Sequence, residues 1–347
     1  MNILLLTEFF PDSNDGEITG GVEARCFYVS RYLQKFGNKV QIISRPKSKW
    51  SPATFSSLPE RIIFTGRMIL TGLKSDFDIV EGTNYTNHLV AALLGFLKQK
   101  PVVCWYADVF AGEWVKNVGL VGILGEIAER ALFILPFVNY IAISKATKEK
   151  LIKQGVSPGK IKIIYCGAEK GKIKKQAIKY DLCAVSRLLP YKHLDDLIYA
   201  ADGLKVAIIG QGPMMKKLKI ISGKNIKFFG FVPKHTDVLK IISSSKIFCH
   251  PSTVEGFGIA IIEAAGLGTP YIAADIPVIR EVTHNGLGGL LFKPESVEDL
   301  KAKIKKLLEN KNLYDKKVKE AKTLAKYYDW QEIAGQTEKF YESLYSH

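Results

Sequence analysis

Cysteine is scarce in this chain. Its 347 residues include five cysteines, and no two of them stand in a Cys-x-x-Cys spacing. Because their number is odd and most lie in apolar, strand-like runs, we expect reduced core residues and not a disulfide framework. The histidines also lack the spacing of metal ligands. The sequence therefore predicts a cytoplasmic protein without a metal site. The five cysteines are Cys26, Cys104, Cys166, Cys183 and Cys249.

Long uninterrupted apolar runs are also missing. The first apolar run, 2–7, is too short and lacks the basic start of a signal peptide. The stretch 118–138 is very apolar, but Glu126, Glu129 and Arg130 interrupt it. It falls short of the roughly 20 apolar residues that cross a bilayer. A core helix or a helix at a membrane surface is the better interpretation.

No recognisable nucleic-acid-binding motif accompanies the strongly basic charge. The formal net charge is +15, and the lysines cluster mildly at 170–179 and 301–319. An excess of this kind suits nucleic acid, an anionic membrane or acidic substrates. Without a motif we do not expect nucleic acid as a partner. A solvated surface explains most of the lysines. Together with 118–138, the charge also suggests peripheral association with the inner face of an anionic membrane.

The length and the order of the elements predict two α/β domains. A chain of 347 residues exceeds the roughly 250–300 residues that one core usually serves. Residues 2–44 alternate as strand, loop, helix and strand, which is a βαβ unit. A second alternation of the same type begins at Leu182, after a lysine-rich linker at 169–179. We therefore expect two doubly wound, Rossmann-like domains.

Dinucleotide and metal motifs are incomplete. Gly20-Gly21 opens a helix and can admit a diphosphate, but the spacing is not G-x-G-x-x-G. At Gly210-Gln211-Gly212 the third glycine is replaced by Met215, so a Rossmann dinucleotide site is excluded there. The Asp-x-Asp of Asp76 and Asp78 favours turn and strand-start carboxylates over a metal-diphosphate motif.

The stretch 252–266 carries the strongest functional signal. Glycines on both sides of Phe257 place Glu255 in a tight loop, and the helix that follows is apolar nearly all round, hence buried. Glu263 stands inside that helix and needs a partner, such as a pair of ligand hydroxyls. The helix start suits a phosphate. A nucleotide sugar has both groups. The alternative, in which Glu263 pairs with a core Arg or Lys and the glycines only make a turn, stays open.

These residues resemble a known family. Glu255 and Glu263, with seven residues between them and Gly268-Thr269-Pro270 after them, are similar to the donor-site motif of retaining glycosyltransferases of family 4, group 1, which have the GT-B fold. The likeness runs nearly end to end. It implies an acceptor-side domain at 1–168, a nucleotide-sugar donor domain at 169–326 that faces it across a cleft, and a helix at 327–347 that crosses back to the first domain.

The resemblance also implies roles for single residues. Glu263 would hold the nucleotide ribose, Glu255 the donor sugar, and the cations Arg187 and Lys192 the departing diphosphate. The implied reaction is retaining transfer of a hexose from a nucleotide-diphosphate sugar to a sugar, lipid-linked or other hydroxyl acceptor, without an obligatory metal. Further donor-binding positions implied by the likeness are Gly20, Gly21, Gly210, Gly212, Phe231, Val232, Gly256, Phe257, Gly258 and Ile259.

One position departs from the family pattern. Ala107 stands where the family often has a histidine that faces the acceptor. Asp108 beside it could accept the proton of the acceptor hydroxyl, or it could be a helix cap or a surface-loop carboxylate. The missing histidine keeps a second class open, a nucleotide-sugar binding protein with weak or no transferase activity.

Overall fold

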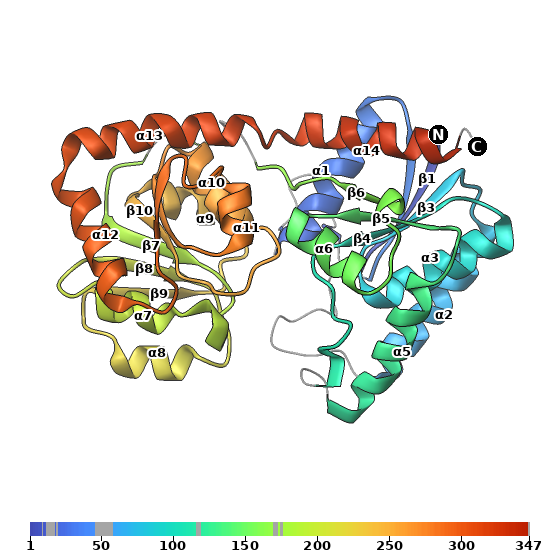
Figure 1. Cartoon of the computed structure of the whole chain (residues 1–347), viewed down its shortest axis with the longest axis horizontal. Helices are drawn as coiled ribbons and strands as arrows, with labels where there is room; N and C mark the ends of the chain where they lie inside the picture. Colours follow the sequence, from blue (N-terminus) through green and yellow to red (C-terminus); the bar gives the residue numbers. More distant parts are fainter. Residues whose placement is uncertain are drawn as a thin grey trace. The chain divides into compact units, whose positions relative to one another are not determined.

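The computed structural model describes residues 1–8, 10–11, 18, 20–45, 58–115, 119–168, 173 and 176–345. The chain forms two compact units (Figure 1). The first contains residues 1–166 and 330–347, and the second contains residues 167–329. The domain boundaries expected from the sequence, at 168 and 326, lie near these divisions. Most of the expected linker at 169–179 lies outside the described residues.

The first unit is built on a parallel six-stranded sheet of order β2-β1-β3-β4-β5-β6. The order reverses beside β1, as in a doubly wound fold. Strands β3 and β4 are buried throughout because helices cover both faces of the sheet. The strands are β1 (Asn2–Leu6), β2 (Lys39–Ile43), β3 (Ile79–Gly82), β4 (Val102–Tyr106), β5 (Val138–Ala142) and β6 (Ile161–Ile163).

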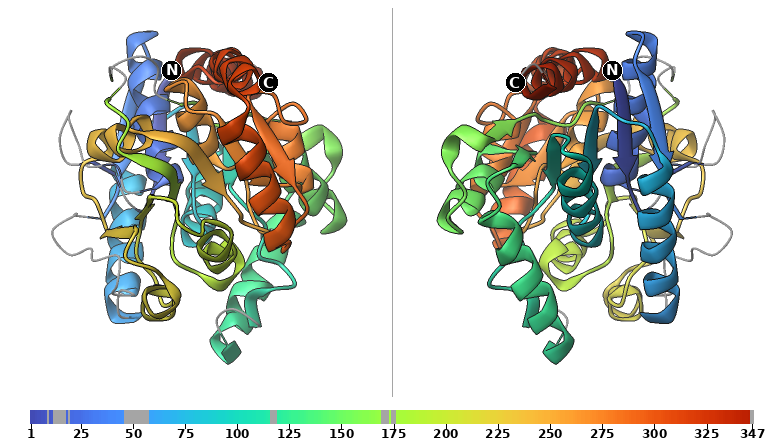
Figure 2. Two further views of the ribbon diagram at one scale, coloured as in Figure 1. Left: turned by 90° about the vertical axis from the view of Figure 1, so that its left-hand side faces the viewer. Right: turned by 90° about the vertical axis from the view of Figure 1, so that its right-hand side faces the viewer.

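Two layers of helices enclose this sheet (Figures 1 and 2). One face carries α1 and α14, and the other carries α2, α3, α5 and α6. The second layer shares one core with the sheet, in which Met68, Leu94, Leu132 and Leu151 are buried. The helices are α1 (Gly21–Lys35), α2 (Leu58–Lys74), α3 (Tyr85–Lys98), α5 (Gly122–Phe133), α6 (Lys145–Lys153) and α14 (Trp330–Tyr345), with short 3-10 turns η2 (Gly119–Val121) and η3 (Pro158–Lys160).

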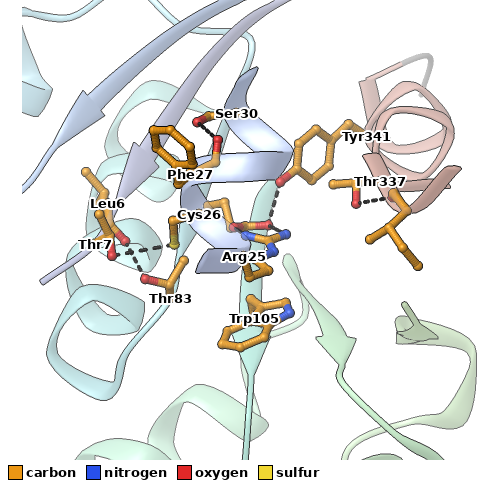
Figure 3. A network of polar contacts seen from close by, with 12 residues as sticks. Leu6, Thr7, Arg25, Cys26, Phe27, Ser30, Thr83, Trp105, Thr337 and Tyr341 are labelled. Atoms are coloured by element: carbon orange, nitrogen blue, oxygen red, sulfur yellow. Dashed lines mark hydrogen bonds and ion pairs between the residues drawn. The ribbon is translucent and has the colours of Figure 1, made fainter. Parts of the chain in front are cut away.

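A buried ion pair joins three elements of the first unit (Figure 3). Arg25 of α1 lies against Glu81 of β3, and its Nη2 donates to Glu81 Oε2 at 2.8 Å. The hydroxyl of Tyr341 on α14 donates to the same oxygen at 2.5 Å. Burial acts to lower the pKa of Arg25, but Glu81 and Tyr341 raise it overall, so the guanidinium stays charged. Helix α14 is therefore tied to the sheet although 163 residues of the second unit precede it.

The second unit repeats the plan with the parallel order β12-β11-β10-β7-β8-β9. Its strand order reverses between β7 and β10. The strands are β7 (Tyr180–Val185), β8 (Val206–Ile209), β9 (Ile226–Gly230), β10 (Ser245–His250), β11 (Tyr271–Ala274) and β12 (Gly289–Phe292). The helices are α7 (Leu194–Ala200), α8 (Met215–Ile221), α9 (His235–Ser243), α10 (Ile259–Gly266), α11 (Pro277–Val282), α12 (Val297–Glu309) and α13 (Lys311–Lys326), with the 3-10 turn η4 (Pro190–Lys192).

Several expectations of the sequence are met in these units. All five cysteines are buried and form no disulfide, which confirms them as core residues. Asp78 precedes β3, and its Oδ2 accepts a bond from the backbone N–H of Asn2 at 2.7 Å, as a strand-start carboxylate does. Within the described ranges no helix has both the length and the hydropathy to cross a bilayer.

Removing one member of the buried pair should be far more costly than breaking a similar pair at the surface. Glu81→Gln leaves the Arg25 charge buried without its counter-ion, so we expect a loss of about 3–5 kcal/mol in the free energy of unfolding of the first unit. Asp275→Asn is the matched control, because Arg280 and Asp275 form a two-pronged pair in which the arginine side chain is 58% exposed. It should cost no more than about 1 kcal/mol. Urea unfolding monitored by circular dichroism measures both, and equal losses would contradict the prediction.

Candidate functional site

The loops after β7 and β10 lie at the point where the strand order of the second unit reverses. In open parallel sheets, ligands bind at this point, outside the carboxyl ends of the strands. The loop after β7 carries Arg187 and leads into η4, which ends at Lys192. Strand β10 ends at His250, and the loop after it carries Glu255. The topology therefore gathers three of the predicted site residues in one place.

Glu255 is bound by two basic side chains in this loop cluster. Its Oε1 accepts a bond from the ammonium of Lys192, and the Nε2 of His250 lies 2.9 Å from the same oxygen. Burial acts to raise the pKa of Glu255, but His250 and Lys192 outweigh that effect and lower it to about 2. The carboxylate is therefore ionised at neutral pH.

Direct pairing of Lys192 with Glu255 adds to what the sequence indicated. From the sequence, we expected the two residues to bind different parts of a donor, the diphosphate and the sugar. His250 precedes the Glu255 loop in the sequence, where a structural role and a role in lining the site were equally open, and in the structure it is a member of the cluster. Arg187 is exposed in the loop after β7.

Helix α10 carries the second predicted glutamate. The helix begins after Gly258, whose φ of +84° requires glycine, and its Ile261 and Ile262 are fully buried, as expected. Glu263 is 6% exposed and pairs with Nε2 of His235 on α9 at 2.9 Å. The pairing partner considered from the sequence was a core Arg or Lys, so the type of partner differs from that alternative.

The neighbouring loop residues differ in burial. Phe257 is buried and meets the ring of Tyr328 edge-on, with centroids 5.5 Å apart. Gly256 and Ile259 beside it are half-buried. Phe231 and Val232, in the loop after β9, are also half-buried.

Gly210 and Gly212 let two loops meet. A Cβ at Gly210 would lie 1.8 Å from the backbone oxygen of Ser186, and a Cβ at Gly212 would lie 2.4 Å from that of Leu188. The backbone N–H of Leu188 donates to the oxygen of Gln211 at 2.9 Å. These glycines therefore fix the loop that carries Arg187. Gly20 and Gly21 belong to the first unit, and Gly20 is exposed and extended, with φ of −171°.

Asp108 lies in the loop after β4 of the first unit. Its Oδ1 accepts a bond from Lys150 Nζ at 2.6 Å and another from the N–H of Val109 at 2.9 Å. Both contacts fit a surface-loop carboxylate, one of the roles left open by the sequence. Lys150 holds the carboxylate, so the acceptor hydroxyl would have to compete with an ammonium for it.

Two family models match the chain, one on each unit. The model described as glycosyl transferases group 1 matches residues 167–324, and the model described as glycosyltransferase family 4 matches residues 19–170. The chain belongs to the group 1 glycosyltransferases of family 4. The pattern of Glu255 and Glu263 lies in the first match, and Asp108 lies in the second.

Relatives of this glycosyltransferase cover most of its length. An uncharacterized glycosyltransferase of Methanocaldococcus jannaschii is 27% identical over 80% of this chain and 78% of its own. A phosphatidylinositol N-acetylglucosaminyltransferase subunit of Arabidopsis thaliana is 21% identical over 99% of this chain and 82% of its own. The crystal structure of Anabaena HepE with UDP and glucose has a TM-score of 0.77 at 19% identity and covers 99% of this chain and 100% of that one. The last likeness shows the GT-B fold.

A small pocket in the first unit of this glycosyltransferase contains a second buried carboxylic acid. The pocket encloses about 70 Å³ between α3 and α5 and is lined by Tyr85, Leu89, Trp114 and Glu129 among others. The indole N–H of Trp114 donates to Glu129 Oε2 at 2.6 Å. Burial raises the pKa of Glu129 to about 7. In the sequence this residue stood out only as an interruption of an apolar stretch.

One cluster of the described residues has side chains that could hold a metal ion. His193, Asp195 and Asp196 bring ligand atoms within 4.8 Å of one another. Lys217 already pairs with Asp195 at 3.0 Å, and His193 Nδ1 lies 3.3 Å from Asp196. These three side chains are therefore engaged with one another and with a lysine, and we assign no metal site to them.

A methyl group at Gly210 should destabilise the second unit. In Gly210→Ala the new Cβ would clash with the Ser186 oxygen at a φ of +133°, which side chains rarely adopt. We expect a loss of about 2–4 kcal/mol in the free energy of unfolding. Gly20→Ala is the control, since nothing lies within 4 Å of its new Cβ, and it should stay within about 0.5 kcal/mol of wild type. Denaturant unfolding measures both changes, and a neutral Gly210→Ala would contradict the loop packing.

Glu129 should make the first unit less stable as the pH rises. Its pKa is about 7 in the folded protein against 4.5 in the unfolded chain, so the unfolded chain ionises first and stability falls between those values. Relative to Glu129→Gln, the free energy of unfolding of wild type should fall by about 2–3 kcal/mol between about pH 5 and about pH 8. Urea titrations of both proteins at each pH measure it. A difference that does not change with pH would refute the raised pKa.

Proposed function

We propose that this protein is a retaining glycosyltransferase that moves a hexose from a nucleotide-diphosphate sugar to a hydroxyl of a sugar, lipid-linked or other acceptor. The observation that carries the proposal is the contact of Lys192 with Glu255 at the reversal of the strand order. A cation for a diphosphate and a carboxylate for sugar hydroxyls lie side by side there. The Glu263 carboxylate in α10 supplies the third group that a nucleotide sugar needs.

Each charged group of this cluster has a separate task in the proposed reaction. Glu263 accepts hydrogen bonds from the ribose hydroxyls while it keeps its contact with His235. Glu255, ionised and held in place, accepts bonds from the donor sugar hydroxyls. Lys192 has three N–H donors, so it can keep Glu255 and also bind a phosphate oxygen. Arg187 adds a second cation where negative charge grows as the sugar–phosphate bond breaks.

Retention of configuration follows from the weak basicity that we assign to Glu255. A carboxylate with a pKa of about 2, bound by Lys192 and His250, is a poor base and a poor nucleophile. We therefore propose that the acceptor attacks from the face that the diphosphate leaves. The proton of the acceptor hydroxyl then passes to the departing diphosphate oxygen, since Ala107 offers no imidazole and Asp108 is paired with Lys150.

The relatives support the substrate classes of this proposal. HepE is described in complex with UDP and glucose, which supports a nucleotide-diphosphate donor. The Arabidopsis relative is named as acting on phosphatidylinositol, which supports a lipid-linked acceptor. We further propose that no metal ion is obligatory, because Arg187 and Lys192 can supply the positive charge that a diphosphate requires.

A nucleotide-sugar binding protein with weak or no transfer is the second candidate. Ala107 in place of a histidine favours it, as does the pairing of Asp108 with Lys150. The two candidates share the donor site and differ in turnover. Efficient transfer to any acceptor would remove the second candidate, while slow donor hydrolysis with every acceptor would favour it.

The donor site is tested by thermal unfolding with a panel of nucleotide diphosphates and their sugars. One donor at about a hundred times its Kd should add about 2.7 kcal/mol to the stability of wild type. Glu263→Ala should remove this gain, since it removes the carboxylate for the ribose. With that donor, Arg187→Ala should lower kcat by about 10²–10³-fold, and EDTA should leave the wild-type rate unchanged.

Matched surface variants separate these roles from general damage. Glu298→Ala removes an exposed glutamate of α12, and Arg280→Ala removes an exposed arginine of α11, both in the same unit. Both should keep the donor shift and the rate. Wild-type binding by Glu263→Ala, or wild-type turnover by Arg187→Ala, would reject the proposed site.

A further inference from the structure

Large apolar side chains are concentrated on the outer surface of one layer of helices. Fourteen of the 22 large hydrophobic side chains that are exposed among the described residues lie between residues 62 and 134. The second unit exposes five. We call the fourteen the apolar face. They are Ile62, Ile63, Leu70, Leu73, Leu89, Leu93, Phe96, Leu97, Val115, Leu120, Ile123, Leu124, Ile127 and Ile134.

Most of these side chains belong to adjacent helices of a single layer. Helix α3 packs between α2 and α5 on the same side of the sheet (Figures 1 and 2). The inner sides of all three helices share one core with the sheet. Their outer sides therefore form a continuous surface. On α5 and the turns on either side of it, the stripe Leu120, Leu124, Ile127 and Ile134 follows helical spacing, and Leu120 is 81% exposed.

An exposed apolar surface of this extent needs an occupant. Contiguous apolar patches larger than a few hundred Å² are rare on monomeric proteins and mark interaction sites. Thirteen of the fourteen side chains are aliphatic, and Phe96 is the single aromatic one. Protein interfaces are instead enriched in Tyr, Trp, Met and Arg. The composition of this face matches hydrocarbon better than it matches a protein partner.

The charge of the chain favours an anionic surface over a second copy of the chain as the occupant of the apolar face. The chain carries a net charge of +15, so a second copy approaching this face would meet like charge, whereas an anionic surface would attract it. Basic residues also lie at both ends of the helical layer. Residues 145–162, which include α6, hold six lysines and one glutamate, and Arg67 and Lys74 are exposed on α2. Lys and Arg near an anionic bilayer each strengthen attachment to it.

We propose that the apolar face of α2, α3 and α5 docks the protein on an anionic lipid bilayer. The helices would lie in the plane of the interface with their aliphatic side chains among the acyl chains and the basic ends of the layer at the headgroups. Docking by this face does not require glycosyl transfer, so it stands apart from the donor site. It would bring the first unit next to acceptors that are confined to a membrane.

Vesicle sedimentation of the full-length chain tests this face. Wild type should sediment with phosphatidylcholine vesicles that contain phosphatidylglycerol, and added salt should weaken the attachment. The double variant Leu124→Gln, Ile127→Gln should bind roughly tenfold or more weakly, since two exposed aliphatic side chains no longer enter the bilayer. The matched variant Ile178→Gln, Ile220→Gln changes two exposed isoleucines of the second unit and should bind like wild type.

The same samples provide the controls for fold and assembly. Circular dichroism and the donor-induced thermal shift should be alike in wild type and both double variants, so a loss of vesicle binding is not a loss of folding or of the donor site. No binding of wild type to anionic vesicles at low salt would overturn the proposal. Equal binding by the two double variants would also overturn it. So would a dimer, detected by analytical ultracentrifugation, that the α5 variant dissociates while vesicles have no effect.

Discussion

The Glu81 carboxylate lies fully buried in β3 and holds the first unit together. A charge in that position is tolerated only when every oxygen has a partner, and Arg25 with Tyr341 satisfies this requirement. The consequence reaches beyond one interaction, because the partners come from α1 and α14, at opposite ends of the chain. The stacked rings of Tyr28 and Trp330, 5.1 Å apart, join the same two helices a few turns away. One carboxylate thus fixes which helix covers this face of the sheet.

The glutamates of the second unit also need partners for their carboxylates, but those partners are of a different type. Glu263 is also buried and Glu255 is half-buried, but their partners are Lys192, His250 and His235, whose N–H donors can also bind a ligand. Arg25 has no such freedom, since its guanidinium is enclosed by Glu81 and the face of Trp105. The buried glutamate of the first unit therefore has partners that hold it in the fold, whereas the glutamates of the second unit have partners that also suit the proposed donor. The difference lies in the type of the basic partner and in how far it is exposed.

Much of the fold could be predicted from the sequence, because apolar segments such as 2–7 and the helix after Gly258 must be buried in a core. The strand reversal beside β7 also follows once the α/β alternation and the right-handed crossover are assumed. The partners of the charged groups could not be predicted. His235 is far from Glu263 in sequence, and only the packing of α9 against α10 brings them together. Glu81 lies in a short apolar strand, and no local sequence pattern predicts Arg25 or Tyr341 as its neighbours. The exposed aliphatic stripes were seen in the sequence only at 118–138, since α2 and α3 gave no signal until their inner sides were known.

The discontinuous make-up of the first unit has a consequence for synthesis on the ribosome. Residues 167–329 form an uninterrupted segment that can complete its sheet as soon as it leaves the exit tunnel. Residues 1–166 of the first unit emerge earlier but must wait for α14, which follows the whole second unit in the chain. Until Tyr341 arrives, Glu81 lacks one of its bonds, and the face of α1 that α14 covers stays open to water and to chaperones. Residues 1–166 are thus made before the second unit but reach their native state after it.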